Sequence, residues 1–246
     1  MKRLALLLYL LLACCTHNNH VEKGTTFAVW VTHDSTVMAV DSRVGRTDRY
    51  GSKTHTDTSC KIFRYGSYFV VYEGISNIGD VPMREKIKQY FDTTQNIENA
   101  CDILSKKLAA GIQNYWNSLS LQTRITLSYN RDSSSSLHFS AIIVKYKKNT
   151  HIICSIFIGN KLNNYNAVVI PSKPITTQKF NGLITGGFNE SINALPSSHR
   201  FFTGLDKVVE CANLIYIEAS KHEDVDSVVN YVIVKPNRFT FGKYQP

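Results

Sequence analysis

The stretch between Gly24 and Gly74 constrains the fold of this chain more than any other part of the sequence. It contains short apolar runs that are bounded by Gly, Asp, Ser and Thr, and these runs cover Thr26–Thr32, Ser35–Val40, Cys60–Tyr65 and Tyr68–Tyr72. Apolar runs of this length between turn residues are typical of paired β-strands. The sequence therefore predicts strands joined by tight turns at His33-Asp34 and Gly66-Ser67.

Each of these strands has a group of chemical interest at one end. They are the hydroxyl of Thr25, the carboxylate of Asp41, the amine of Lys61 and the backbone N–H of Gly74. If the chain is cut before Thr25, the new α-amino group can act as the base that activates the Thr25 hydroxyl for nucleophilic attack. A nearby ammonium favours the neutral, basic form of such an amine. A backbone N–H can stabilise the oxyanion of a tetrahedral intermediate.

These residues resemble the start of a proteasome β-type subunit, a threonine peptidase of the N-terminal-nucleophile hydrolases. The matching segments are Gly24-Thr25-Thr26, Val40-Asp41-Ser42-Arg43, Lys61-Ile62-Phe63 and Glu73-Gly74. Each segment alone also occurs as an ordinary turn or strand flank, so the resemblance depends on their order and spacing. It is strong up to Gly74 and weaker over the rest of the chain.

The resemblance implies a role for each matching residue: nucleophile Thr25, buried aspartate Asp41, arginine Arg43, lysine Lys61 and oxyanion glycine Gly74. Lys61 stands a few residues later than the family spacing, which predicts an inserted loop over Gly45–Ser59. Lys53 is the competing candidate for the lysine, and the following Phe63 favours Lys61.

The later part of the chain matches the family less closely. Gly186-Gly187 resembles a glycine-rich turn but lacks the adjacent serine that usually assists the amine of the nucleophile. Glu223-Asp224 resembles an acidic turn and gives Asp224 as the supporting aspartate, with Asp226 and Ser227 as the alternative candidates.

By position, the resemblance places Val44, Tyr72 and Ser76 around the pocket for the substrate residue before the scissile bond. Tyr72 is bulky and would make this pocket shallow, and Glu73 beside it favours a basic substrate side chain.

Beyond Gly74 the apolar spacing becomes helical. Helices are expected from a cap at Asp80 through Phe91, from Ile97 through Ile112 and over Leu205–Ser220, with Cys101 and Cys211 on their apolar faces. Further strands are expected at His138–Lys145, His151–Ile158, Ala167–Ile170, Leu183–Thr185, Val228–Val234 and Phe239–Phe241. This order is that of an α+β protein, and the resemblance implies a four-layer αββα sandwich, as in other N-terminal-nucleophile hydrolases, in one domain over residues 25–246.

The N-terminal segment has the pattern of an export signal. Lys2-Arg3 precedes the apolar run Leu4–Ala13, which is too short to span a membrane as a helix. Leu11–Cys14 resembles a bacterial lipobox, which predicts a signal peptide over residues 1–14 and lipidation of Cys14. Residues 15–24 are then a tether or propeptide. The alternative is an ordinary cleaved signal followed by incidental cysteines.

The 246-residue chain has a net charge of +9, with the positive residues spread along it rather than gathered in one run. We therefore expect no nucleic-acid partner, and the chemistry of Thr25 needs no metal or cofactor. The leading hypothesis is an exported threonine-type peptide or amide hydrolase, periplasmic or membrane-anchored, which forms a homo-oligomeric ring as the family does. The alternatives are a small-molecule or cell-wall amidase of the same fold, or an inactive membrane-anchored lipoprotein.

Overall fold

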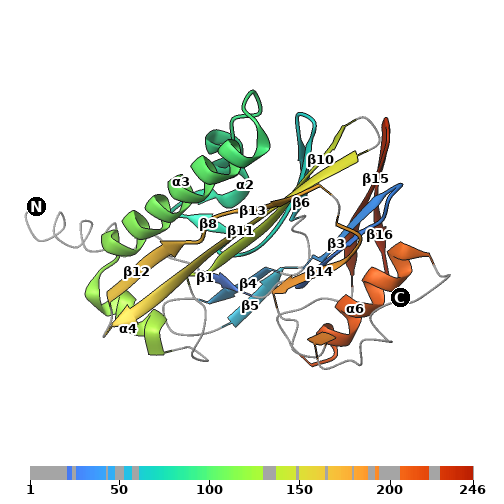
Figure 1. Cartoon of the computed structure of the whole chain (residues 1–246). Helices are drawn as coiled ribbons and strands as arrows, with labels where there is room; N and C mark the ends of the chain where they lie inside the picture. The colour runs from blue at the N-terminus through green and yellow to red at the C-terminus, as the bar shows by residue number, and fades with distance from the viewer. Residues whose placement is uncertain are drawn as a thin grey trace, which may run out of the picture.

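The computed structural model describes residues 21–23, 26–42, 44–47, 53–56, 61–129, 137–147, 150–163, 166–178, 180–187, 192–193, 206–221 and 228–245. Its largest elements are two antiparallel sheets with helices against them (Figure 1).

The first sheet has five strands in the order β14-β2-β3-β15-β16. Every neighbouring pair in it is antiparallel. Its strands are β2 (Thr26–Val31), β3 (Thr36–Asp41), β14 (Gly182–Gly187), β15 (Val229–Lys235) and β16 (Arg238–Tyr244). The strands that the sequence predicted at these positions are confirmed, with ends that differ by a few residues.

The second sheet has six strands. Five follow the order β12-β11-β10-β7-β6, and β13 adds to β11. They are β6 (Ile62–Tyr65), β7 (Tyr68–Gly74), β10 (Phe139–Lys147), β11 (Thr150–Asn163), β12 (Asn166–Pro171) and β13 (Ile175–Thr177). The short strand β13 was not predicted from the sequence.

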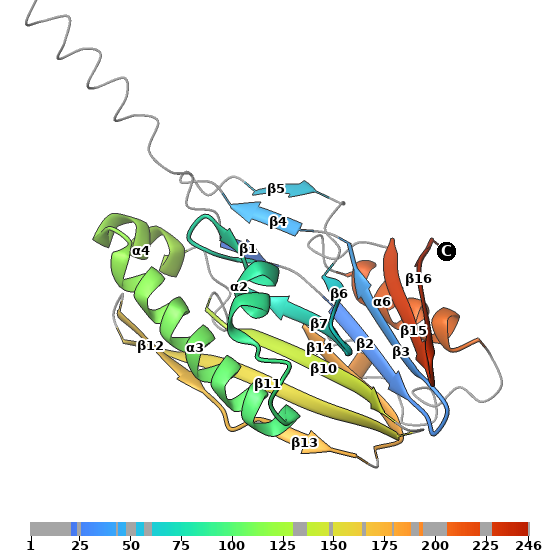
Figure 2. The same cartoon turned by 90° about the horizontal axis from the view of Figure 1, so that it is seen from above.

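A third, smaller sheet lies to one side of the two large ones (Figure 2). It contains β1 (Val21–Lys23), β4 (Val44–Thr47) and β5 (Lys53–Thr56), all antiparallel. The described parts of the expected loop Gly45–Ser59 are therefore strands, and so is part of the expected tether. A two-stranded ribbon, β8 (Asn77–Ile78) with β9 (Val81–Pro82), precedes the first helix.

The two large sheets pack face to face across a hydrophobic core. Phe27, Val29 and Val31 of β2 point into this core and meet Phe69 and Val71 of β7. The intervening residues of β2, Ala28 and Trp30, point to the opposite side, where helix α6 lies. Because β2 is buried on both faces, it is a continuous apolar run rather than an alternating one.

Helices pack on part of the outer face of each large sheet. Helices α2 (Met83–Tyr90) and α3 (Ile97–Ser118) contribute to the core on the six-stranded sheet, and α6 (Lys207–Ala219) packs on β2 and β3 (Figure 1). The side chain of Asn96 accepts the N–H of Asn99 and so caps α3. The expected cap at Asp80 is wrong, because Pro82 occupies the N-cap of α2 and makes no side-chain cap. Helix α4 (Leu121–Tyr129) was not predicted.

The expected four-layer αββα sandwich is wrong. The structure is mostly antiparallel β-sheet, with a third sheet and few helices. In the part of the chain that the structure describes, α6 is the one long helix against the five-stranded sheet. Strands β4 and β5 satisfy backbone groups by pairing with each other, which adds sheet where the sequence predicted a loop.

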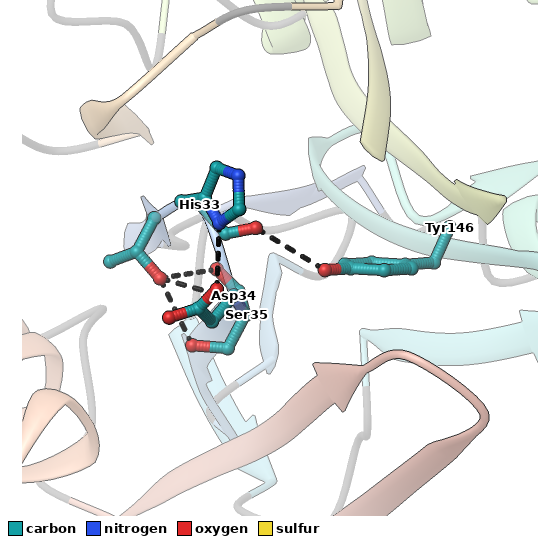
Figure 3. A network of polar contacts seen from close by, with 5 residues as sticks. His33, Asp34, Ser35 and Tyr146 are labelled. Atoms are coloured by element: carbon teal, nitrogen blue, oxygen red, sulfur yellow. Dashed lines mark hydrogen bonds and ion pairs between the residues drawn. The ribbon is translucent and has the colours of Figure 1, made fainter. Parts of the chain in front are cut away.

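The turn between β2 and β3 makes a polar contact with the six-stranded sheet. The Tyr146 hydroxyl of β10 donates to the backbone carbonyl of His33 at 3.3 Å. Figure 3 shows this contact beside the 2.7 Å contact between His33 Nδ1 and the Asp34 carboxylate. Burial and the Asp34 charge raise the pKa of Tyr146, so its hydroxyl keeps the proton that it donates. The two large sheets are therefore linked at this end.

We found no helix in the described residues that is long and apolar enough to cross a membrane.

The packing of Gly186 gives a test of the five-stranded sheet. A Cβ at Gly186 would overlap the buried ring of Phe27. We expect Gly186→Ala to lower the free energy of unfolding by about 1–3 kcal/mol, as overpacking does. The control is Gly111→Ala on α3, where a Cβ meets the flexible end of Ile78 and alanine gains about 1 kcal/mol of helix propensity. Urea titration should give a lower free energy of unfolding for Gly186→Ala and a higher one for Gly111→Ala. Equal changes in the two variants would contradict the pairing of β14 with β2.

Candidate functional site

Several chain segments of the two large sheets meet at one end of the molecule, which we call the rim. The rim is defined by Thr26, Asp41, Lys61, Gly74 and Gly187. Register places Gly187 opposite Thr26 in the five-stranded sheet. In the six-stranded sheet, the N–H of Tyr72 donates to the carbonyl of Lys61, and Gly74 lies two residues further along the same strand.

Asp41 is the central residue of the rim. It is the last residue of β3 and is fully buried. Its Oδ2 accepts the backbone N–H of Thr26 at 2.7 Å. Its Oδ1 lies 3.9 Å from Nζ of Lys61, and the two side chains are 0% and 5% exposed. Both carboxylate oxygens therefore have partners in the interior.

The contact between Asp41 and Lys61 connects the two large sheets. Asp41 ends β3 of the five-stranded sheet, whereas Lys61 directly precedes β6 of the six-stranded sheet. A buried ion pair attracts far more strongly than an exposed one, because little water screens it. The pair thus holds a positive and a negative charge at fixed positions next to the start of β2.

Gly74 fulfils a strict backbone requirement. Its φ of +91° lies in a region that side chains rarely adopt, and a Cβ there would overlap the backbone carbonyl of His138. The next residue, Ile75, donates its N–H to that same carbonyl at 3.1 Å. Only glycine therefore allows β7 to pass so close to the start of β10.

The structure brings together some of the predicted site residues. Asp41 and Lys61 are in contact, whereas the competing candidate Lys53 belongs to β5 of the small sheet. Thr26, which directly follows the predicted nucleophile, is held by Asp41. The predicted residues Thr25, Arg43, Asp224 and the lipidation site Cys14, with the possible substitutes Asp226 and Ser227, lie outside the described residues.

The three residues predicted to line a substrate pocket lie on different segments of the chain and in different surroundings. Tyr72 is buried, and its ring packs against Phe63 and Phe139 in the core beneath the helices. Ser76 is partly buried, and its hydroxyl has no hydrogen-bond partner among the described residues. Val44 begins β4 of the small sheet.

A second polar cluster lies next to Gly74. The Glu73 carboxylate accepts a hydrogen bond from Oγ of Ser140 at 2.6 Å, and its other oxygen lies 2.9 Å from Nε2 of His138. Glu73 and Ser140 are directly opposite each other on β7 and β10. The sequence singled out Glu73 but not its partners, because a pairing across 67 positions leaves no local signal.

Two of the buried cysteines, Cys101 and Cys211, are poor alternatives to a threonine nucleophile. Burial raises the pKa of the Cys211 thiol to about 12. The pKa of Cys101 is also raised, because its thiol donates a hydrogen bond to Cys154 and is buried. A thiol with a raised pKa is protonated near neutral pH and unreactive. The described residues contain no group of three or more His, Cys, Asp or Glu side chains that could hold a metal ion.

Comparison with models of known protein families finds no match for this chain, and no curated protein is significantly similar to it. The relationship to proteasome β-type subunits therefore stays a proposal.

The buried pair gives a stability test that does not depend on any enzymatic activity. We expect Asp41→Asn to lower the free energy of unfolding by about 3–5 kcal/mol, because it leaves the Lys61 charge buried without its partner. The control is Asp102→Asn on α3, which breaks the exposed pair with Lys106 and should cost at most about 1 kcal/mol.

The double variant Asp41→Asn/Lys61→Met should recover part of the lost stability, because it removes the unpaired charge as well. Denaturant titration measures all three variants. Equal losses for Asp41→Asn and Asp102→Asn would show that the buried pair does not contribute.

The cysteine chemistry predicts selective protection. At pH 7–8, iodoacetamide should leave Cys211 unmodified in the folded protein and modify it fully in denaturant, as peptide mapping by mass spectrometry can measure. The raised pKa also means that folding favours the protonated thiol. The contribution of this thiol to stability is therefore present below its ordinary pKa of 9.0 and is lost as the pH rises toward about 12. Rapid labelling of native Cys211 at pH 7 would contradict this assignment.

Proposed function

We propose that the protein is a threonine-type peptide or amide hydrolase whose nucleophile is Thr25, exposed by cleavage after Gly24. One observation carries the proposal: the buried carboxylate of Asp41 both accepts the N–H of Thr26 and pairs with Lys61. In the family that the sequence resembles, a lysine and an aspartate act beside the N-terminal threonine. Here Asp41 contacts the residue after Thr25 and pairs with Lys61.

In the proposed reaction, Oγ of Thr25 attacks the carbonyl carbon of an amide substrate. The α-amino group of Thr25 takes the hydroxyl proton and delivers it to the leaving nitrogen, which breaks the C–N bond and leaves an acyl ester on Oγ. Water, deprotonated by the same amine, then hydrolyses the ester and regenerates the free threonine.

Lys61 and Asp41 act through the amine rather than on the substrate. The ammonium of Lys61 disfavours a second positive charge nearby, so the α-amino group of Thr25 stays neutral and basic. Asp41 holds Lys61 in place and also anchors the backbone directly after the nucleophile. The N–H of Gly74, at the end of β7, is the proposed oxyanion donor.

The export signal, lipidation at Cys14, a homo-oligomeric ring and a peptide substrate stay predictions from the sequence.

The proposal predicts a defined N-terminus and a defined set of inactive variants. Intact-mass measurement of protein from its native host should show a chain that begins at Thr25. Against a panel of peptide amides, Thr25→Ala should lose activity by roughly 10³-fold or more, whereas Thr25→Ser should keep measurable turnover because it keeps a hydroxyl and an α-amine.

Lys61→Ala should also be inactive, while Thr240→Ala at an exposed position on β16 should match the unmodified enzyme. Equal activity of Thr25→Ala would rule out the threonine mechanism. An uncut Gly24-Thr25 bond, together with no hydrolysis by the unmodified protein, would favour an inactive lipoprotein.

A further inference from the structure

The Glu73 carboxylate is a buried negative charge without a permanent counterion. Its side chain is 7% exposed, and its partners are Oγ of Ser140 and Nε2 of His138. Among the described residues, no lysine or arginine forms an ion pair with it. Histidine is charged over only part of the pH range, so it neutralises Glu73 only conditionally. Burying a charge without a partner is costly.

The carboxylate still has capacity to bind a cation. An ionised carboxylate offers about four acceptor positions, and each oxygen of Glu73 makes one hydrogen bond to a described residue. A guanidinium or ammonium group donates hydrogen bonds to such acceptor positions and would supply the missing charge. The adjacent Gly74 is only partly buried and carries no side chain that would block the approach.

Strand alternation places Glu73 on the face of the six-stranded sheet that looks toward the five-stranded sheet. Val71 and Ile142 form a cross-strand pair in the core between the sheets, and Glu73 with Ser140 is the next pair on the same face. The intervening residue Tyr72 points to the helix side. Glu73 therefore extends the inter-sheet core to its polar end at the rim.

We infer that Glu73, held by Ser140 and His138, binds a cationic group of the substrate next to the reacting bond. The substrate class is then an amide with an arginine-, lysine- or amine-containing residue close to the scissile carbonyl. This inference deepens the proposed hydrolase, because Glu73 directly precedes the proposed oxyanion residue Gly74. The binding of a cation at Glu73 does not itself require catalysis.

The first experiment measures binding alone. Benzamidinium and its neutral counterpart benzamide are titrated into the mature protein, and dissociation constants are read from NMR chemical shifts. Benzamidinium should bind more tightly than benzamide. Glu73→Gln should weaken benzamidinium binding by at least about tenfold, in line with a charge-assisted hydrogen bond of about 1.5–3 kcal/mol, and leave benzamide unchanged.

Two further variants separate a binding role from a structural one. Glu85→Gln, at an exposed position on α2, makes the same change elsewhere and should leave both constants unchanged. Ser140→Ala removes one competing donor and should keep or strengthen benzamidinium binding. If Glu73 merely stabilises the fold, Glu73→Gln and Ser140→Ala would weaken binding together, and the inference would be overturned.

The second experiment uses hydrolysis. For peptide amides, the ratio of kcat/KM for arginine over norleucine before the scissile bond should fall at least about tenfold in Glu73→Gln, relative to the unmodified enzyme. If Glu73→Gln loses benzamidinium binding while the unmodified protein hydrolyses none of the peptide amides, the proposed hydrolase is refuted and the cation site is retained. Hydrolysis with an unchanged ratio and unchanged benzamidinium binding would overturn the cation site and retain the hydrolase.

Discussion

The buried contact between Asp41 and Lys61 is the interaction on which the architecture of the rim depends. Removing two charges from water costs more than their attraction returns unless further hydrogen bonds satisfy them, and the Thr26 N–H supplies one of these to Asp41. Such a pair adds little stability over an apolar replacement. Its consequence is geometric, because it fixes the end of β3, the start of β6 and the start of β2 relative to one another.

The polar groups of the rim lie at strand ends for a physical reason. Between the two sheets the strands contribute apolar side chains such as Val29, Met38 and Val71, and charged groups there would have to be desolvated without partners. At the ends of the strands, backbone N–H groups and polar side chains of neighbouring segments come within reach, so Asp41, Lys61 and Glu73 have partners although they are buried. The same packing that excludes charges from the middle of the sandwich therefore concentrates them at its edge.

The sequence predicted local structure well and long-range structure unevenly. Apolar runs identified β2, β3, β6 and β7, and helical spacing identified α3, because burial imposes these periods directly. The pairing of Asp41 with Lys61 could be predicted from the order of the motifs that resemble the family, but not from periodicity. Strands β4 and β5 are polar, so no apolar period revealed them, and the four-layer expectation failed with them. The partners of Glu73 were missed because they lie 65 and 67 positions away along the chain.

The charges at the rim and the charge of the whole protein act in opposite directions on a cationic substrate. The chain carries +9, which disfavours the approach of a cation at long range. Charges separated by more than about 8 Å are largely screened at physiological salt, so the local groups decide binding. Asp41 and Lys61 neutralise each other at 3.9 Å, which leaves Glu73, among the residues that the structure describes, as the unbalanced charge near Gly74. A cationic group bound there would place the adjoining carbonyl near the backbone of Gly74, so specificity and oxyanion stabilisation would both originate at the end of β7.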